Sequence, residues 1–273
     1  MKGINRLLCV CNDIQKSQML FKRAAQIAKA HDISLTFLFV IEKALFELPV
    51  YGENHENIET IKQTLHSQAK ETGMDGIVVF VYENDTVGRA MLELEHEHHT
   101  MIITPFEENI TKALLTSCNV PTLILKESQK TYEKVLVALD NTRVENYCLP
   151  FIQTLFEGSK LHLLQNEQYF FYPLTDPFIS SGMIPYDTTL EMVEEEEVIG
   201  AEKSHFDLFC RQHGLEGTFK LSEFSIDEDI VAESKKHNAD ILVILATEDT
   251  LLDMAVKNIL SLSKTDIFVC REK

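Results

Sequence analysis

The sequence predicts an α/β protein built from two similar halves, each with its own parallel sheet. Short apolar runs rich in β-branched residues alternate with segments of helical period, a pattern typical of parallel strands joined by crossover helices. The same order of elements occurs twice along the 273 residues, which indicates an internal duplication. A chain of this length can hold two ordinary domains, each with a packed core.

The first half contains five predicted strands and three helical segments. The strands are expected at 6–11, 34–41, 76–82, 100–106 and 121–126. Between them lie the helical segments "QKSQMLFKRAAQIAKAH", "ENIETIKQTLHSQAKETG" and "VGRAMLELEHEH". Gly73 ends the second of these, because glycine commonly closes a helix in the left-handed conformation.

The second half follows the polar link "ESQKTYE" and runs through the same order. Its strands are expected at 134–140, 160–165, 218–224, 240–246 and 266–271, and its helices at 144–156, 188–213 and 228–237. We place the domain boundary within the link, which gives domains at residues 1–128 and 129–273.

The net charge of -18 limits the classes of partner. Most of the acidic excess lies in residues 129–273, with 26 acidic against 13 basic residues. Such a balance repels phosphate backbones and anionic membranes, and no basic patch offsets it. We therefore predict no nucleic-acid partner and no membrane partner.

The six cysteines lie mostly in apolar runs, and no CxxC pair is present. Reduced, buried thiols are the simplest interpretation. The apolar stretch near the N-terminus is too short for a signal-peptide core, and no run is long enough for a membrane helix. The predicted location is the cytoplasm.

Three sets of motifs carry a resemblance to a known family. They are the strand ends "CVCND" and "LVALDNT", the third crossovers "YENDTVGRAMLELEHEHHTMIIT" and "FSIDEDIVAESKKHNADILVILA", and the last strand "CNVPTLILK". Together they resemble the universal stress protein family in its tandem, two-domain form of bacterial type. The resemblance implies a Rossmann-like parallel sheet of order 3-2-1-4-5 in each domain, packing of the domains through their last strands, and a role in stress response.

Ligands of such sheets bind beyond the carboxyl ends of the strands, where the strand order reverses. The candidate binding residues at these switch points are Asn12 and Asp13 in the first half and Asp140, Asn141 and Thr142 in the second. The resemblance implies that Asp140 is the family's adenine-side aspartate. Alternatively, Asp and Asn at a strand end are simple turn formers.

The family's nucleotide-binding members carry a glycine-rich phosphate loop after the fourth strand, and this chain has none. No glycine occurs between Gly88 and Gly158, and none follows Gly217. Acids stand there instead: Glu107 and Glu108 in the first half, Glu248 and Asp249 in the second. We therefore predict no cofactor and no ATP binding of the usual kind. The acids also suit a first helical turn, with Asn109 and either Asp249 or Thr250 as the expected N-caps.

Two other segments leave alternatives open. "ELEHEHHT" has metal-like spacing, with Glu93 near His96 and Glu95 near His99, but histidines also suit a helix C-terminus. We favour the latter and assign no metal. The aromatic-rich loop 166–186 suits internal packing, a partner or dimer surface, or a lid over a ligand.

The predicted function follows from these absences. No catalytic motif is present, so we assign no catalytic residue and predict a non-enzymatic stress-response or regulatory protein that works through protein contacts. The alternative is a sensor of a nucleoside or an apolar metabolite, which would bind in the second-domain crevice near Asp140. We favour a homodimer over a monomer.

Overall fold

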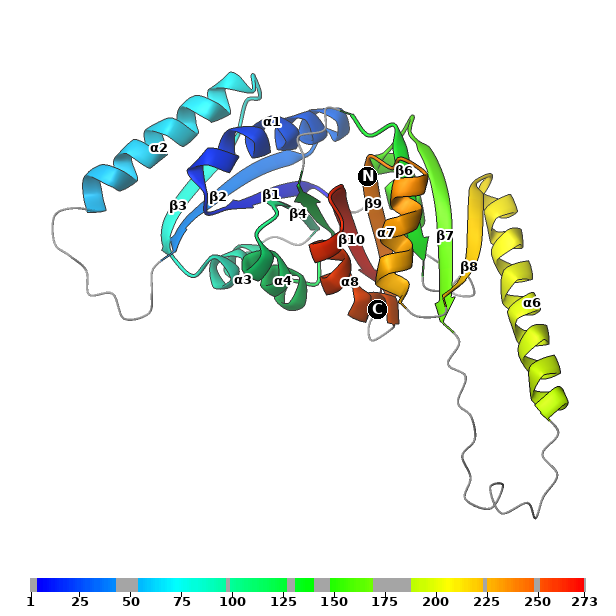
Figure 1. The fold of residues 1–273 in the computed structure, drawn as a ribbon. Coiled ribbons are helices and arrows are strands. Elements are labelled where there is room, and N and C mark those ends of the chain that lie inside the picture. The colour runs from blue at the N-terminus through cyan, green and yellow to red at the C-terminus, as the bar shows by residue number, and fades with distance from the viewer. Residues whose placement is uncertain are drawn as a thin grey trace, which may run out of the picture.

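The computed structural model describes residues 4–42, 54–96, 99–126, 131–139, 148–168, 188–222, 225–247 and 251–272. Within these residues, strands and helices alternate along the chain (Figure 1). The first half comprises β1 (Arg6–Cys11), α1 (Ile14–His31), β2 (Ser34–Glu42), α2 (Asn54–Glu71), β3 (Val78–Asn84), α3 (Thr86–His96), β4 (Thr100–Pro105), α4 (Glu108–Ser117) and β5 (Thr122–Leu125). The second comprises β6 (Lys134–Leu139), α5 (Cys148–Leu155), β7 (Lys160–Gln168), α6 (Thr188–His213), β8 (Glu216–Ser222), α7 (Ile226–Lys236), β9 (Ile241–Thr247), α8 (Leu251–Leu262) and β10 (Asp266–Glu272).

The strands form one ten-stranded sheet of order β3-β2-β1-β4-β5-β10-β9-β6-β7-β8. Read from its outer edge, each half has the order 3-2-1-4-5, and its strands pair in parallel. The expected α/β fold class and strand order are therefore confirmed. The domain boundary at 128/129 falls outside the described residues and stays a prediction.

The two halves meet where β5 and β10 pair antiparallel, which we call the seam. Ile124 lies opposite Ile267, Leu123 opposite Phe268, and Thr122 opposite Val269. The expected contact through the last strands is thus confirmed.

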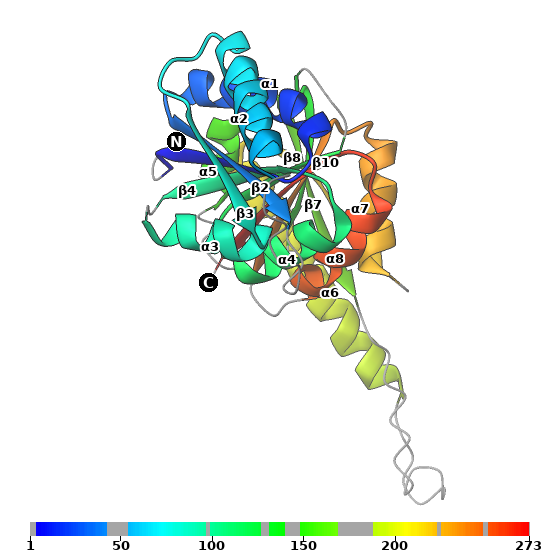
Figure 2. The same ribbon diagram turned by 90° about the vertical axis from the view of Figure 1, so that its left-hand side faces the viewer.

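Helices cover both faces of the sheet (Figures 1 and 2). Side chains from α1, α2, α5 and α6 pack into one core, and those from α3, α4, α7 and α8 pack into the cores on the opposite face. The central strands alternate between the two faces: Cys9 joins the first core, while Leu8 and Val10 join a core on the other side. Strands buried on both faces consist of continuous apolar runs, which explains why β1 was evident from the sequence.

The predicted bounds are wrong at several polar ends. β7 continues to Gln168, because Asn166 pairs with Lys220 of β8 and Gln168 pairs with Ser222. A polar stretch of this kind is expected to form a loop, yet here it pairs with β8 at the outer edge of the sheet. β8 begins at Glu216, because Glu216 pairs with His162 of β7. Over the next residue, Gly217, α6 packs so closely that an added Cβ would lie 2.5 Å from the Phe206 ring.

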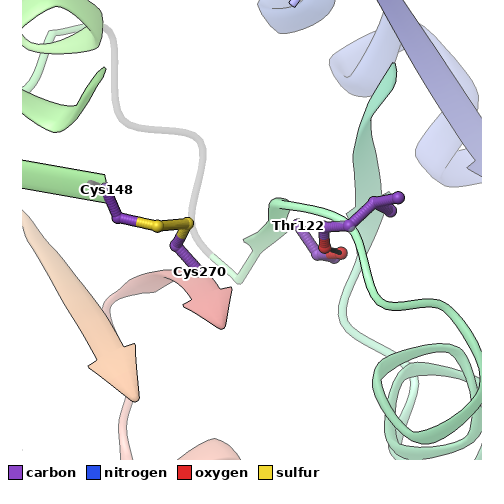
Figure 3. The surroundings of a disulfide bond; sticks show 4 residues. Thr122, Cys148 and Cys270 are labelled. Atoms are coloured by element: carbon purple, nitrogen blue, oxygen red, sulfur yellow. Dashed lines mark hydrogen bonds between the residues drawn. A yellow bond between two sulfur atoms is a disulfide. The ribbon is translucent and has the colours of Figure 1, made fainter. Parts of the chain in front are cut away.

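A disulfide joins Cys148, the first residue of α5, to Cys270 of β10 (Figure 3). The expectation of six reduced thiols is therefore wrong for this pair. The two cysteines are 122 residues apart in sequence, so their spacing carries no signal. Closing a loop of this length restricts the unfolded chain and adds about 4–5 kcal/mol in the chain-entropy picture.

The other four cysteines, Cys9, Cys11, Cys118 and Cys210, are free and buried. Burial raises the pKa of the Cys11 thiol to about 12 and that of the Cys118 thiol to about 11. These thiols are therefore protonated at neutral pH, and thiols of this kind react slowly.

Alkylation tests the disulfide directly. Protein unfolded in urea with iodoacetamide and no reductant should take up four alkyl groups, because four cysteines are free. Prior reduction should raise the number to six, the total in the chain. Intact-mass spectrometry reads both numbers, and Cys148→Ser serves as the control, with five labels under either condition. Six labels without reductant would contradict the disulfide.

Candidate functional site

The first switch point lies where β1 ends, between its neighbours β2 and β4. Asn12 and Asp13 follow directly and connect β1 to α1. The Asp13 carboxylate caps α1, because its Oδ1 accepts a hydrogen bond of 2.9 Å from the Gln15 N–H. Its Oδ2 lies 3.8 Å from the ammonium of Lys16. Asp13 therefore already serves the helix start, as residues of this type commonly do.

The turn from β4 to α4 holds the two acids expected there. Glu107 occupies the N-cap position, but its side chain makes no capping hydrogen bond. Its backbone N–H donates to the Thr111 hydroxyl at 3.0 Å. Glu108 pairs with Lys112 at 2.7 Å, and this hydrogen bond lowers the pKa of the Glu108 carboxyl. The expectation that Asn109 caps this helix is wrong, because α4 already begins at Glu108.

The corresponding residues of the second half, Asp140, Asn141, Thr142, Glu248 and Asp249, lie outside the described residues. So does most of the aromatic-rich loop 166–186, of which β7 includes 166–168. Thr250, an alternative N-cap, also lies outside them. Asp140 directly follows β6, which runs between β7 and β9. This is the position that β1 has in the first half.

A hollow of about 460 Å³ opens beside the first switch point. It lies at the carboxyl ends of β4 and β5, between the start of α1 and the end of α8, so both halves contribute to it. We call it the lysine hollow. Its lining residues are Lys16, Met19, Pro105, Phe106, Leu125, Lys126, Ser261, Ser263 and Lys264. Three of the nine are lysines and none is acidic.

Lys126 is the most constrained of the three lysines. Its ammonium donates hydrogen bonds to the backbone carbonyls of Leu260 and Ser263, near the end of α8. It also lies 4.1 Å from the centre of the Phe106 ring. Burial lowers the pKa of Lys126 to about 8, while the nearby carboxylate of Asp266 acts in the opposite direction.

Sequence reasoning missed the lysine hollow. Lys126 follows the last strand of the first half, so its place at the carboxyl edge could have been noticed. Ser261 and Lys264, which line the hollow with it, come from the other half, however, and the antiparallel seam brings them there.

In the segment with metal-like spacing, residues 93–100, Glu93 makes contacts with arginines. Glu93 forms an ion pair of 2.5 Å with Arg89, and its backbone carbonyl accepts from the guanidinium of Arg6. His96 ends α3. Within the described parts of the chain, no three His, Cys, Asp or Glu residues gather closely enough to hold a metal ion.

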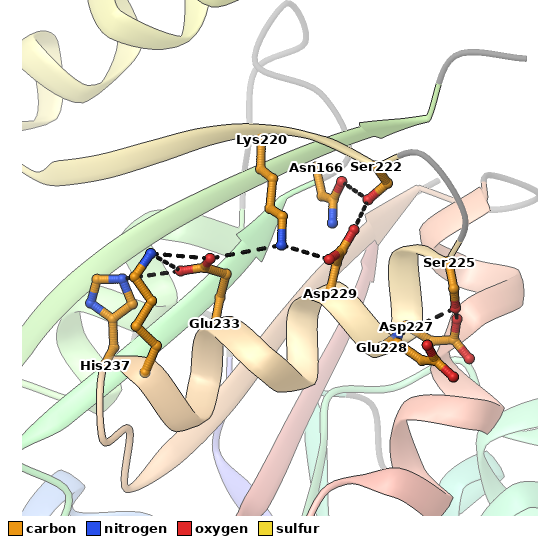
Figure 4. A network of polar contacts seen from close by, with 10 residues as sticks. Asn166, Lys220, Ser222, Ser225, Asp227, Glu228, Asp229, Glu233 and His237 are labelled. Carbon is orange, nitrogen blue, oxygen red and sulfur yellow. Dashed lines mark hydrogen bonds and ion pairs between the residues drawn. The ribbon is translucent and has the colours of Figure 1, made fainter.

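A second polar cluster links β8 to α7 (Figure 4). Lys220 lies 2.5 Å from Oδ1 of Asp229 and 3.8 Å from Glu233. The Ser222 hydroxyl contacts both Asp229 and Asn166, and Ser222 as a residue is 3% exposed. A serine so buried is closed to a substrate, so the cluster holds the helix to the sheet.

Comparison with known proteins gives similarity in structure but not in sequence. No family model matches the chain, and no curated protein matches it. A putative universal stress protein from Pseudomonas aeruginosa UCBPP-PA14 aligns over 99% of this chain and 94% of its own, with TM-score 0.63 and 17% identity. A universal stress protein from Archaeoglobus fulgidus DSM 4304 aligns over 97% and 96%, with TM-score 0.63 and 17% identity.

A third structure, a functionally unknown protein from Pseudomonas aeruginosa PAO1, aligns over 99% of this chain and 93% of its own, with TM-score 0.61 and 16% identity. This chain has the universal stress protein fold. The likeness extends over nearly the whole length of each chain, so it includes both halves of the sheet. At these identities it establishes the fold alone.

The Asp229 cluster predicts a pH-dependent contribution to stability. Burial raises the pKa of Asp229, but hydrogen bonds from Lys220 and Ser222 outweigh it, so the folded pKa is lowered. The contribution is therefore complete above the unfolded pKa near ~4 and is lost as the pH falls through the folded pKa. Asp229→Asn should lower the free energy of unfolding by about 1–2 kcal/mol at neutral pH.

Urea denaturation followed by circular dichroism measures this effect for the wild type and Asp229→Asn. The difference between them should shrink at a pH below ~4. Glu228→Gln is the matched control, because Glu228 is an exposed acid in the first turn of the same helix. A loss that stays the same at both pH values would contradict the role of the Asp229 charge.

Proposed function

We propose that the protein is a non-enzymatic regulatory protein of the universal stress type, which acts in stress response through protein contacts. We further propose that it does not bind ATP in the family's usual way. The start of α4 carries this proposal. There a phosphate would need free amides and glycine, and it would meet Glu107 and Glu108 instead.

Three features of that turn oppose a phosphate. The chain passes from β4 to α4 through Phe106 and Glu107 alone, with no glycine to allow close backbone approach. The Glu107 amide is already taken by Thr111. Like charges ~4 Å apart repel by roughly 4 kcal/mol at an effective dielectric near 20, before screening by salt.

The non-enzymatic part of the proposal rests on the side chains that could do chemistry. The free thiols are buried, and burial raises the pKa of Cys11, Cys118 and Cys210. Ser222 is buried within its network. We also propose a bacterial source, a cytoplasmic location and a homodimer. In the described part of the chain, no helix has the length and apolar character needed to cross a membrane.

One observation favours a second candidate, a small-ligand sensor. β6 lies between β7 and β9, so the chain leaves it at a switch point, and the next residue is Asp140. A nucleoside or an apolar metabolite could bind there, because neither carries a phosphate that the acids Glu248 and Asp249 would repel.

Thermal melting with and without ATP, AMP or adenosine tests both candidates. A ligand at ~100 times its Kd adds about 2.7 kcal/mol and raises the midpoint by a few degrees. We expect no shift with ATP or AMP. A shift with ATP that Asp13→Asn or Asp140→Asn abolishes would overturn the proposal. A shift with adenosine alone, lost in Asp140→Asn, would support the sensor instead.

A further inference from the structure

We propose that the lysine hollow binds a small organic anion, a compact apolar body that carries one carboxylate or phosphate group. This site lies beside the switch point, at the carboxyl ends of β4 and β5 between α1 and α8, and it draws on both halves. The inference therefore goes beyond the proposed function.

The charges of the hollow stand apart from those of the whole chain. The chain carries 43 acidic and 25 basic residues, yet the lining of the hollow includes three lysines, Lys16, Lys126 and Lys264, and no acid. Three ammonium groups in one concave site form a local positive potential. This potential attracts anions, which the acidic remainder of the protein surface repels.

Three acids close to residues of the hollow, Asp13, Glu108 and Asp266, have partners of their own. Asp13 lies beside Lys16, and Glu108 pairs with Lys112 while lying 3.5 Å from the Ser261 hydroxyl. Asp266 is fully buried and accepts from the Lys126 N–H at 2.6 Å and from the Tyr132 hydroxyl at 2.7 Å. Lys264 is exposed and has no ion pair in the described residues.

Lys126 provides a fixed cation at the hollow's wall. Two carbonyls of the α8 end and the face of Phe106 hold its ammonium in place. An ammonium has three donors, so one remains for a ligand oxygen. Because this lysine is already positioned, a ligand spends little entropy on ordering it.

The remaining walls define the body of the ligand. Met19, Pro105, Phe106 and Leu125 are apolar, and Ser261 and Ser263 complete the lining. A volume of about 460 Å³ is within the usual range for small-molecule pockets, which also tend to form between domains. A bare ion would leave the apolar walls uncovered, whereas an organic anion contacts both kinds of surface.

Isothermal titration calorimetry with phenyl phosphate and benzoate tests the proposal, with inorganic phosphate and phenol as the partial ligands. We expect the organic anions to bind and both partial ligands to bind at least about tenfold more weakly, a difference of ~1.4 kcal/mol. Equal affinity for inorganic phosphate would overturn the organic part of the proposal. No binding of either organic anion at millimolar concentration would overturn the site.

Two lysine variants locate the binding. Lys264→Gln should weaken binding of phenyl phosphate about tenfold, and because Lys264 is exposed this variant should fold normally. Lys257→Gln is the matched control, since Lys257 is exposed on α8 but does not line the hollow. Equal loss in both variants would indicate a general charge effect and contradict the site.

The pH dependence separates Lys126 from the ordinary lysines. Its pKa is about 8, so affinity should fall as the pH rises through that value, well below the pH at which exposed lysines lose their charge. A flat profile between neutral pH and pH ~9 would contradict a role for Lys126.

The same variants distinguish a failure of this proposal from a failure of the proposed function. An ATP site at the switch point would lose binding in Asp13→Asn and keep it in Lys264→Gln. Binding in the lysine hollow should show the reverse, because Asn preserves the cap of α1 while Lys264 belongs to the hollow alone.

Discussion

The antiparallel pairing of β5 with β10 is the contact on which the rest of the structure depends. It makes one sheet of two, and it brings the end of α8 over the end of β5. The buried carboxylate of Asp266 supports this pairing, because it accepts from the Lys126 N–H at the end of β5 as well as from the Tyr132 hydroxyl of its own half. Undocking would take the Lys126 N–H away from Asp266, and a hydrogen bond to a charged group contributes more than one between neutral groups.

Corresponding positions of the two halves link a helix to the sheet through different side chains. Val40 of β2 pairs with Tyr82 of β3, and Asn166 of β7 pairs with Lys220 of β8, so Tyr82 and Lys220 occupy matching places. In the first half Arg89 of α3 lies over the Tyr82 ring at 3.7 Å and pairs with Glu93. In the second half the strand carries the cation and α7 carries the acids. Such exchanges keep the link between helix and sheet while removing sequence identity, so the duplication is visible in the order of elements alone.

The sequence predicted the fold class and most strands because strands buried on both faces are continuous apolar runs, as in β1 and β9. It failed where an element is polar or where a contact joins distant residues. Asn166 lies in the ladder near an outer edge and looks like a loop. The pairing of Cys148 with Cys270 and the meeting of Lys126 with Lys264 both depend on how the halves dock, and spacing along the chain does not encode this. Asp13 lies between β1 and α1, where the predicted strand and helix place it, but its capping of α1 became visible only in the structure.

The lack of glycine at the start of α4 and the presence of the lysine hollow have a common physical logic. A phosphate held by backbone amides requires the chain to approach it closely, and so it requires glycine. Lysine side chains reach an anion from a distance and place no such demand on the backbone. Glu107 and Glu108 can therefore stabilise the start of a helix where a nucleotide-binding relative needs a phosphate cradle. Recognition of an anion by Lys16, Lys126 and Lys264 uses a neighbouring space that exists only because two halves are joined. In such a protein a ligand that fills this space contacts both halves and stabilises their docking.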